Sequence, residues 1–84
     1  MASGLLWFRY WICRLSQRLK DLRRRMADDE DVPPYIIFGD VTLTALAVQK
    51  PRSHQELLEI YGIGTVKAVR FGPSILRVIE EVVG

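Results

Sequence analysis

Hydrophobic residues recur at intervals of three and four along the first third of the chain, without a break. The positions are Leu5, Phe8, Ile12, Leu15, Leu19, Leu22 and Met26. This spacing places the seven side chains on one face of a helix, so it predicts one long amphipathic helix over residues 5–28. The helix is expected to end at the acidic run of residues 28–31, before the helix-breaking residues Pro33 and Pro34.

Aromatic residues widen this apolar face at its beginning only, where Trp7, Tyr10 and Trp11 flank the stripe. The pattern fits first turns that pack on another domain or on a second copy of the chain, including a coiled coil. It also fits turns that fold back on their own bundle or, in a fragment, turns that are left exposed. Trp7 and Trp11 are therefore candidate interaction residues.

The middle of the chain contains two sets of helix start and stop signals. Asp40 is a candidate N-cap for a helix over residues 40–48. Ser53 and Glu56 have capping-box spacing, so they predict the start of a helix that continues to position 60. Gly62 follows this helix where a left-handed C-terminal cap is expected.

The C-terminal third predicts two more helices. A short helix follows Gly64 and ends at Gly72, and Pro73 suits the first turn of a last amphipathic helix that reaches position 83. The YIIF stretch at residues 35–38 has no second strand candidate to pair with, so we interpret it as an apolar loop inserted into the core. The predicted fold is all-α: a compact five-helix bundle with an extended first helix. The predicted core consists of Leu19, Leu22, Ile36, Phe38, Leu43, Leu46, Leu57, Ile60, Ile63, Val66, Ile75 and Ile79.

Length and composition limit what such a bundle can be. A chain of 84 residues supports one small domain, and 49% hydrophobic residues suffice for its core. Cys13 is the only cysteine, which excludes an internal disulfide, and His54 is the only histidine, which excludes the usual Cys/His zinc clusters. The sequence has no candidate membrane span or signal peptide. We therefore expect an intracellular protein, cytoplasmic (in a bacterium, at the nucleoid) or nuclear.

The net charge of +2 is unevenly distributed. Residues 1–25 contain seven lysines and arginines and one acid, a net charge of +6, whereas residues 26–84 have a net charge of −4. A basic first segment on a mildly acidic remainder argues against general binding to polyanions. Any nucleic-acid contact is expected to be local and weak.

Catalytic and metal-binding chemistry has little support in the sequence. Ser53 and His54 are adjacent at a helix start, where their side chains diverge, so they do not form a nucleophile–base pair. Cys13 has basic neighbours but no accompanying base. The carboxylates of residues 28–31 splay apart on one helix end, whereas metal sites need carboxylates that converge from separate elements. We therefore expect no catalytic residue, metal, cofactor or small-molecule substrate.

The strongest binding candidate is the turn Gly62-Ile63-Gly64 (the glycine turn), which joins two predicted helices. The free N–H groups of the helix after Gly64 attract a phosphate, and Lys67 and Arg70 lie on one face beside it. This pattern is typical of a helix-hairpin-helix, which holds nucleic-acid backbone without reading bases. In the competing interpretation the glycines only permit a tight turn with Ile63 buried. A β-branched residue at Gly64 is expected to disrupt the turn.

The order of these motifs resembles the HRDC domain, the helicase-and-RNase-D C-terminal module. The matching features are Pro33, Pro34, Tyr35, Ile37, Phe38 and Asp40, then the helix with Leu43 and Ala47, then Pro51, Ser53, Glu56 and Leu57, and finally the glycine turn with Lys67, Phe71 and Gly72. The resemblance begins near Leu15 and covers roughly four-fifths of the chain. It divides the chain into an N-terminal extension of the first helix, residues 1–14, and an HRDC domain, residues 15–84. Deleting residues 1–13 is expected to leave the core folded.

The resemblance implies a non-catalytic module appended to RecQ-type DNA helicases or RNase D-type exonucleases. With a RecQ-type helicase as preferred parent, the domain gives weak, backbone-directed contact to single-stranded or branched (junction) DNA and helps substrate choice. One alternative is a protein-interaction module that docks on the helicase body or a sister HRDC domain without binding DNA. A second is the C-terminal module of an RNase D-type exonuclease. From Leu15 onward the chain has ten basic and ten acidic residues, and this electrical neutrality weakens the inference of DNA binding from the resemblance.

The resemblance also places Tyr35 on a surface that meets single-stranded DNA, where the ring stacks on a base. The alternative packs Tyr35 on the first helix. Lys50 and Arg52 flank Pro51 on an exposed loop and are candidates to contact phosphates. The full set of candidate DNA-binding residues is Tyr35, Lys50, Arg52, Gly62, Gly64, Lys67, Arg70, Arg24 and Arg25.

Overall fold

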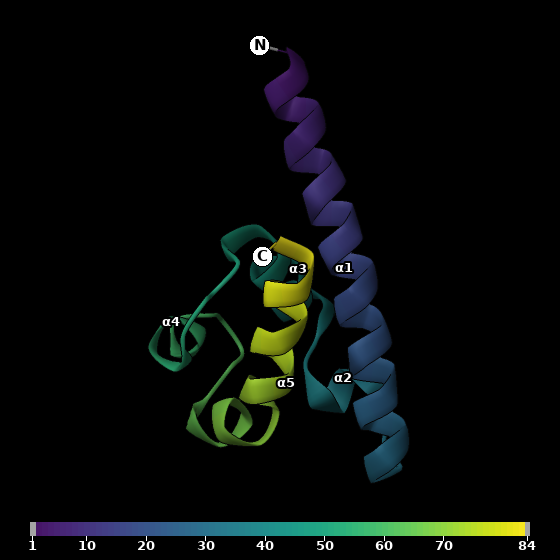
Figure 1. Ribbon diagram of the computed structural model, residues 1–84. Helices are drawn as coiled ribbons and strands as arrows, with labels where there is room; N and C mark the ends of the chain where they lie inside the picture. The colour runs from purple at the N-terminus through teal and green to yellow at the C-terminus, as the bar shows by residue number, and fades with distance from the viewer. Residues whose placement is uncertain (1, 84) are drawn as a thin grey trace.

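Five helices make up the computed structural model, which describes the backbone of residues 2–83 and the side chains of residues 9–83. They are α1 (Ala2–Glu30), α2 (Pro34–Ile37), α3 (Asp40–Gln49), α4 (His54–Leu58) and α5 (Thr65–Val83). No strand occurs in residues 2–83, so the prediction of an all-α, five-helix fold is confirmed. α1 runs along one side of the bundle and packs against α2, α3 and α5, while α4 lies on the opposite side against α5 (Figure 1).

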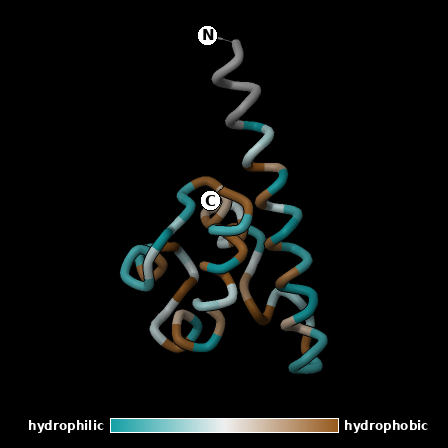
Figure 2. Tube along the Cα trace, viewed as in Figure 1, coloured by the Kyte–Doolittle hydropathy of each residue, from teal (hydrophilic) through white to brown (hydrophobic). Residues whose placement is uncertain are grey.

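The hydrophobic stripe predicted on the first helix forms one wall of the core. Leu15, Leu19 and Leu22 are buried in one cluster with side chains from the other four helices. Figure 2 shows hydrophobic and hydrophilic positions alternating along α1 from turn to turn, as an amphipathic helix requires. The side chains of Leu5 and Phe8 lie outside the described residues.

Ten of the twelve predicted core residues are buried, but Ile36 and Val66 are not. Ile36 is 49% exposed because residues 34–37 form a helical turn, α2, rather than a loop, and this turn directs Ile37 inward. Val66 is 69% exposed because Ala68, two residues and about 200° further along the helix, faces the core instead. Both errors concern which side of a helix faces inward, at the short helix α2 and in the first turn of α5.

The caps of α3 and α4 link neighbouring elements. Gly39, rather than the predicted Asp40, is the N-cap of α3, and no side chain caps this helix. The carboxylate of Asp40 instead accepts a hydrogen bond from Arg23 of α1 at 3.0 Å. Ser53 caps α4 as predicted, since its Oγ accepts the backbone N–H of Glu56 at 3.1 Å.

α5 is continuous across Gly72 and Pro73, where the sequence predicted two separate helices. A proline inside a helix lacks the N–H donor and crowds the carbonyl four residues earlier, so it bends the helix. Figure 1 shows α5 changing direction between its first turns and its C-terminal part. Gly72 is tolerated before Pro73 because it has no Cβ to clash with the proline ring. A Cβ on Gly72 would also lie 3.0 Å from a methyl carbon of Leu57, so α4 packs closely on this bend.

The N-terminal limit of the domain is testable by truncation. Trp11 and Ile12 are half-buried against the core, so we propose that the folding unit begins at Trp11 rather than after residue 14. Deleting residues 1–10 is expected to change the melting temperature by less than about 4 °C. Deleting residues 1–13 should lower the free energy of unfolding by about 1–2 kcal/mol, because both side chains are lost. Thermal denaturation followed by circular dichroism compares the two truncated proteins. Equal melting temperatures would favour a folding unit that begins after residue 14.

Candidate nucleic-acid interface

A partly buried hydrogen bond holds the glycine turn against α3. Gly62 has a φ of +88°, the left-handed conformation predicted for this glycine. Thr42, only 4% exposed, donates its hydroxyl to the backbone carbonyl of Tyr61 at 2.8 Å. A Cβ on Gly62 would lie 2.0 Å from the Oγ1 of Thr42. Glycine is therefore required at position 62 by its backbone conformation and by the close approach of α3.

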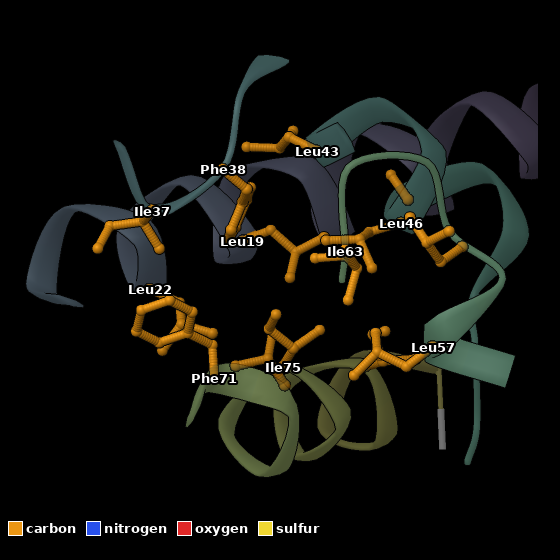
Figure 3. Close-up of a cluster of buried hydrophobic side chains, with 14 of the residues drawn as sticks. Leu19, Leu22, Ile37, Phe38, Leu43, Leu46, Leu57, Ile63, Phe71 and Ile75 are labelled. Atoms are coloured by element: carbon orange, nitrogen blue, oxygen red, sulfur yellow. The ribbon is translucent and has the colours of Figure 1, made fainter. Parts of the chain in front are cut away.

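Ile63 and Gly64 face in different directions. Ile63 is 5% exposed, and its side chain points into the core among the labelled side chains of Leu19, Leu46 and Ile75 (Figure 3). The carbonyl of Gly64 accepts the N–H of Ala68 at 2.9 Å, and a Cβ on Gly64 would meet no atom within 4 Å. A Cβ alone therefore meets no obstacle at position 64, and disruption of the turn by a β-branched residue there stays a prediction. The first turn of α5 leaves its N–H groups without helical acceptors, next to this unobstructed position.

The two cations beside the glycine turn have different surroundings. Arg70 forms an ion pair with Glu30 at the end of α1, and its guanidinium carbon lies 5.0 Å from the centre of the Phe71 ring. Lys67 is half-buried and forms no ion pair with the side chains of residues 9–83. Lys67 is thus the cation left for a ligand, whereas Arg70 helps to hold α5 to α1.

Tyr35 is 69% exposed on α2, so the interpretation that packs it on the first helix is wrong. Its neighbours Ile37 and Phe38 are each 1% exposed and anchor the segment in the core. Arg23 fastens the same segment to α1 by donating to the backbone carbonyl of Phe38 at 3.1 Å and to the carboxylate of Asp40 at 3.0 Å. The tyrosine ring is therefore held out on a well-supported turn.

Lys50 and Arg52 flank Pro51, which is buried. Lys50 has a left-handed φ of 49°, and its N–H closes α3 by donating to the carbonyl of Leu46 at 3.0 Å. The side chain of Arg52 is exposed, and its backbone N–H donates to the carboxylate of Glu56 at 3.1 Å. Main-chain hydrogen bonds therefore fix the loop that carries these two cations.

The structure does not bring the arginines of α1 to the glycine turn. Arg24 follows Leu15 by nine residues, or about two and a half turns, so it lies on the face of α1 that is opposite the core. Arg25 is its exposed neighbour. α4 and the first turns of α5 lie on the other side of the bundle (Figure 1). Of the two candidate interaction residues, Trp11 is half-buried against the core, and the side chain of Trp7 lies outside the described residues.

The sequence reasoning missed an exposed apolar group around the glycine turn. Tyr61, Val66 and Val69 are 76%, 69% and 65% exposed. The two valines share a face of α5 because they are three residues apart, and Tyr61 directly precedes Gly62. The valine spacing was an available signal, but the same spacing also fits a buried helix face.

The residues considered for catalysis have ordinary surroundings. Ser53 caps α4, and His54 and Cys13 are exposed. No cluster of three or more His, Cys, Asp or Glu suited to a metal ion occurs among the side chains that the structure describes. None of the described helices combines the length and hydrophobicity that a membrane span requires.

Comparison with known proteins shows which family the chain resembles. A model of the HRDC domain matches residues 14–79. The ATP-dependent DNA helicase RecQ of Haemophilus influenzae is 45% identical over 67 residues, which are 80% of this chain and 11% of the helicase. The ATP-dependent DNA helicase hus2/rqh1 of Schizosaccharomyces pombe is 40% identical over 77 residues, which are 86% of this chain and 6% of the helicase. This chain thus spans about a tenth or less of the curated relatives it matches.

The fold comparison agrees with the sequence comparison. A solved structure described as D. radiodurans RecQ HRDC domain 3 superposes with a TM-score of 0.84 and 33% sequence identity. The match covers 86% of this chain and 95% of that domain, so the similarity extends over nearly the whole of the solved domain.

Proposed function

Because the chain belongs to the HRDC domain family, whose members are accessory, non-catalytic modules, we propose that it is an auxiliary nucleic-acid-binding module of a RecQ-type DNA helicase. It gives weak, backbone-directed contact to single-stranded or branched DNA and helps substrate choice. The relatives named above are helicases, which favours a helicase over an RNase D-type exonuclease as the parent. The expected location follows from this parent: the bacterial cytoplasm at the nucleoid, or the nucleus.

The observation that carries the proposal is the open backbone at the start of α5. Gly64 presents no side chain, a Cβ there would meet nothing within 4 Å, and Lys67 lies one turn further on without an ion pair in the described residues. Donor N–H groups, the positive end of a helix dipole and a nearby ammonium group together suit a phosphate. The exposed ring of Tyr35 and the cations Lys50 and Arg52 supply further contacts to the strand.

The phosphate contacts are testable through their salt dependence. Two to three phosphates held around the glycine turn should contribute about −1.4 to −2.1 to the slope of log K against log salt, with a dissociation constant on the order of 10⁻⁵–10⁻³ M. Lys67→Ala should reduce the magnitude of the slope by about 0.7 and leave the melting temperature unchanged. Titration of a labelled oligonucleotide followed by NMR chemical shifts measures the affinity and maps the surface.

A matched control variant distinguishes loss of the Lys67–phosphate contact from a general effect of lower net charge. Arg77→Ala removes one exposed cation from the other end of α5 and should leave affinity and slope close to wild type. Tyr35→Ala should weaken binding by about 1–3 kcal/mol without changing the slope, because it removes stacking and no charge. If Lys67→Ala behaves like Arg77→Ala while Tyr35→Ala abolishes binding, the glycine turn is only a packing device.

The exposed apolar residues Tyr61, Val66 and Val69 favour a second candidate, docking on the helicase body or on a sister HRDC domain. An apolar contact of this kind depends little on salt, because it releases no counterions. Absence of salt-dependent oligonucleotide binding by the 84-residue chain, together with NMR shifts of these three residues on adding the parent's helicase core, would favour docking.

A further inference from the structure

The outer face of α1 carries cations that the bundle does not use. Between positions 9 and 25 the helix has seven lysines and arginines and one acid, Asp21. Arg18 pairs with Glu81 at 2.5 Å and Arg23 pairs with Asp40 at 3.0 Å, so these two arginines hold α1 to α5 and α3. The other five side chains are exposed and form no ion pair with residues 9–83; they are Arg9, Arg14, Lys20, Arg24 and Arg25, here called the basic row.

Helix geometry places the basic row on one side of α1. Arg24 lies opposite the buried Leu15, and the four other cations lie within about a third of a turn on either side of Arg24. The row is about 24 Å long from Arg9 to Arg25. The rest of the chain, residues 26–84, has a net charge of −4, so an anionic ligand is attracted to this side of the molecule and not to the molecule as a whole.

An open hollow lies at the N-terminal end of the basic row. It is lined by Arg9, Tyr10, Cys13, Arg14 and Gln17. The side chain of Tyr10 is 52% exposed, and its ring meets the ring of Trp11 edge-on, with centroids 5.3 Å apart and an interplanar angle of 78°. The surface of the hollow is mostly apolar, so it suits a base stacked on the Tyr10 ring, whose orientation is supported by Trp11. Arg9 and Arg14 border the same hollow and carry guanidinium groups, which bind phosphate.

We propose that the basic row is a second site for single-stranded nucleic acid. Its cations bind successive phosphates without reading sequence, and the ring of Tyr10 stacks on a base that lies in the hollow. This inference does not rest on the glycine turn, because the basic row lies on the face of α1 that is opposite the buried Leu15, whereas the glycine turn joins α4 to α5. If both sites bind, one domain holds two strands at once, as at a branch point.

Two triple variants of the 84-residue chain distinguish binding at the basic row from binding at the glycine turn. Arg9→Gln/Arg14→Gln/Lys20→Gln removes three of the five cations of the basic row, and Arg52→Gln/Lys67→Gln/Arg77→Gln removes the same charge elsewhere. The probe is a labelled oligothymidine of about 20 nucleotides, titrated at several salt concentrations, with amide shifts recorded. The row variant should lose the shifts of residues 9–25, bind about tenfold or more weakly, and have a salt slope smaller in magnitude by about 2.1. Its melting temperature should not change, since the row does not contact the core.

The outcomes separate this inference from the proposed function. The Arg52/Lys67/Arg77 variant should lose the oligonucleotide-induced amide shifts around the glycine turn and keep those of residues 9–25. This result supports two independent sites. Wild-type shifts confined to the glycine turn, or equal losses at both places in both variants, would overturn the proposal. Tyr10→Leu keeps the apolar contact with Trp11 and should reduce the preference for single strands over a duplex of equal length. Equal binding of duplex and single strand by the wild type would contradict the stacking role.

Discussion

Replacing Gly62 by alanine should lower the free energy of unfolding by about 3 kcal/mol, the largest effect expected among the four glycines between positions 9 and 83. A left-handed conformation costs a residue with a Cβ about 1–2 kcal/mol, and Gly62 has a φ of +88°. The new Cβ would also lie 2.0 Å from the Oγ1 of Thr42, which must then move and lose its hydrogen bond to Tyr61, worth about 0.5–1.5 kcal/mol. For a domain of this size the melting temperature should fall by about 12–24 °C.

A double-mutant cycle with Thr42 separates the two causes. In a Thr42→Ala background the hydroxyl is absent, so Gly62→Ala should cost the backbone penalty of about 1–2 kcal/mol, together with any small shift needed to relieve the 3.3 Å approach to the Cβ of residue 42. Gly64→Ala is the matched control in the same turn, because its Cβ would meet no atom within 4 Å and its φ is not left-handed. It should change stability by less than about 0.5 kcal/mol. Equal losses at positions 62 and 64, measured by urea denaturation, would contradict this division of roles.

The glycine turn shows where reasoning from sequence alone stops. The spacing of Gly62, Ile63 and Gly64 predicted a tight turn with a buried isoleucine, and Ile63 is buried. The sequence pattern predicted the left-handed cap at Gly62, but it could not reveal the close approach of Thr42, twenty residues earlier in the chain. Contacts between distant segments are absent from local patterns. The same reason explains why the ion pair of Arg70 with Glu30 was not predicted.

Long periodic segments were predicted better than short ones. The stripe on the first helix covers many turns, so its buried face was assigned correctly at Leu15, Leu19 and Leu22. Val66 was placed in the core because a few apolar residues around one glycine fit several faces of a helix. The break at Gly72 and Pro73 was predicted from signals that normally end a helix. Close packing of α4 on this bend, seen at Leu57, favours a continuous helix instead.

For the candidate binding residues, too, the sequence predicted some features and the structure was needed for others. Tyr35 is exposed and Lys67 has no ion-pair partner among residues 9–83, which is compatible with the roles suggested by the sequence pattern. Charge counts alone treated the arginines of the first helix as equivalent. The structure separates them into Arg18 and Arg23, which hold the bundle together, and the exposed basic row. That division depends on where Asp40 and Glu81 lie in three dimensions.

The second large effect is expected at Phe38. Its side chain is 1% exposed, and Phe38→Ala should lower the free energy of unfolding by about 3–5 kcal/mol, since it removes a buried ring and leaves a cavity. The guanidinium carbon of Arg23 lies 5.8 Å from the centre of the same ring, and this contact adds about 0.5–1 kcal/mol. The total stability of a domain this small is about 4–13 kcal/mol, so the variant should be partly unfolded at moderate temperature.

Ile36→Ala is the matched control for Phe38, because both residues belong to the same apolar stretch and both were predicted to be buried. Ile36 is 49% exposed on α2, so its truncation should cost less than about 1 kcal/mol. Urea denaturation monitored by circular dichroism at 222 nm gives both free energies under identical conditions. Similar losses for the two variants would show that α2 buries both side chains. A small loss for Phe38→Ala would show that this turn is not anchored in the core, and the support inferred for the exposed ring of Tyr35 would be lost with it.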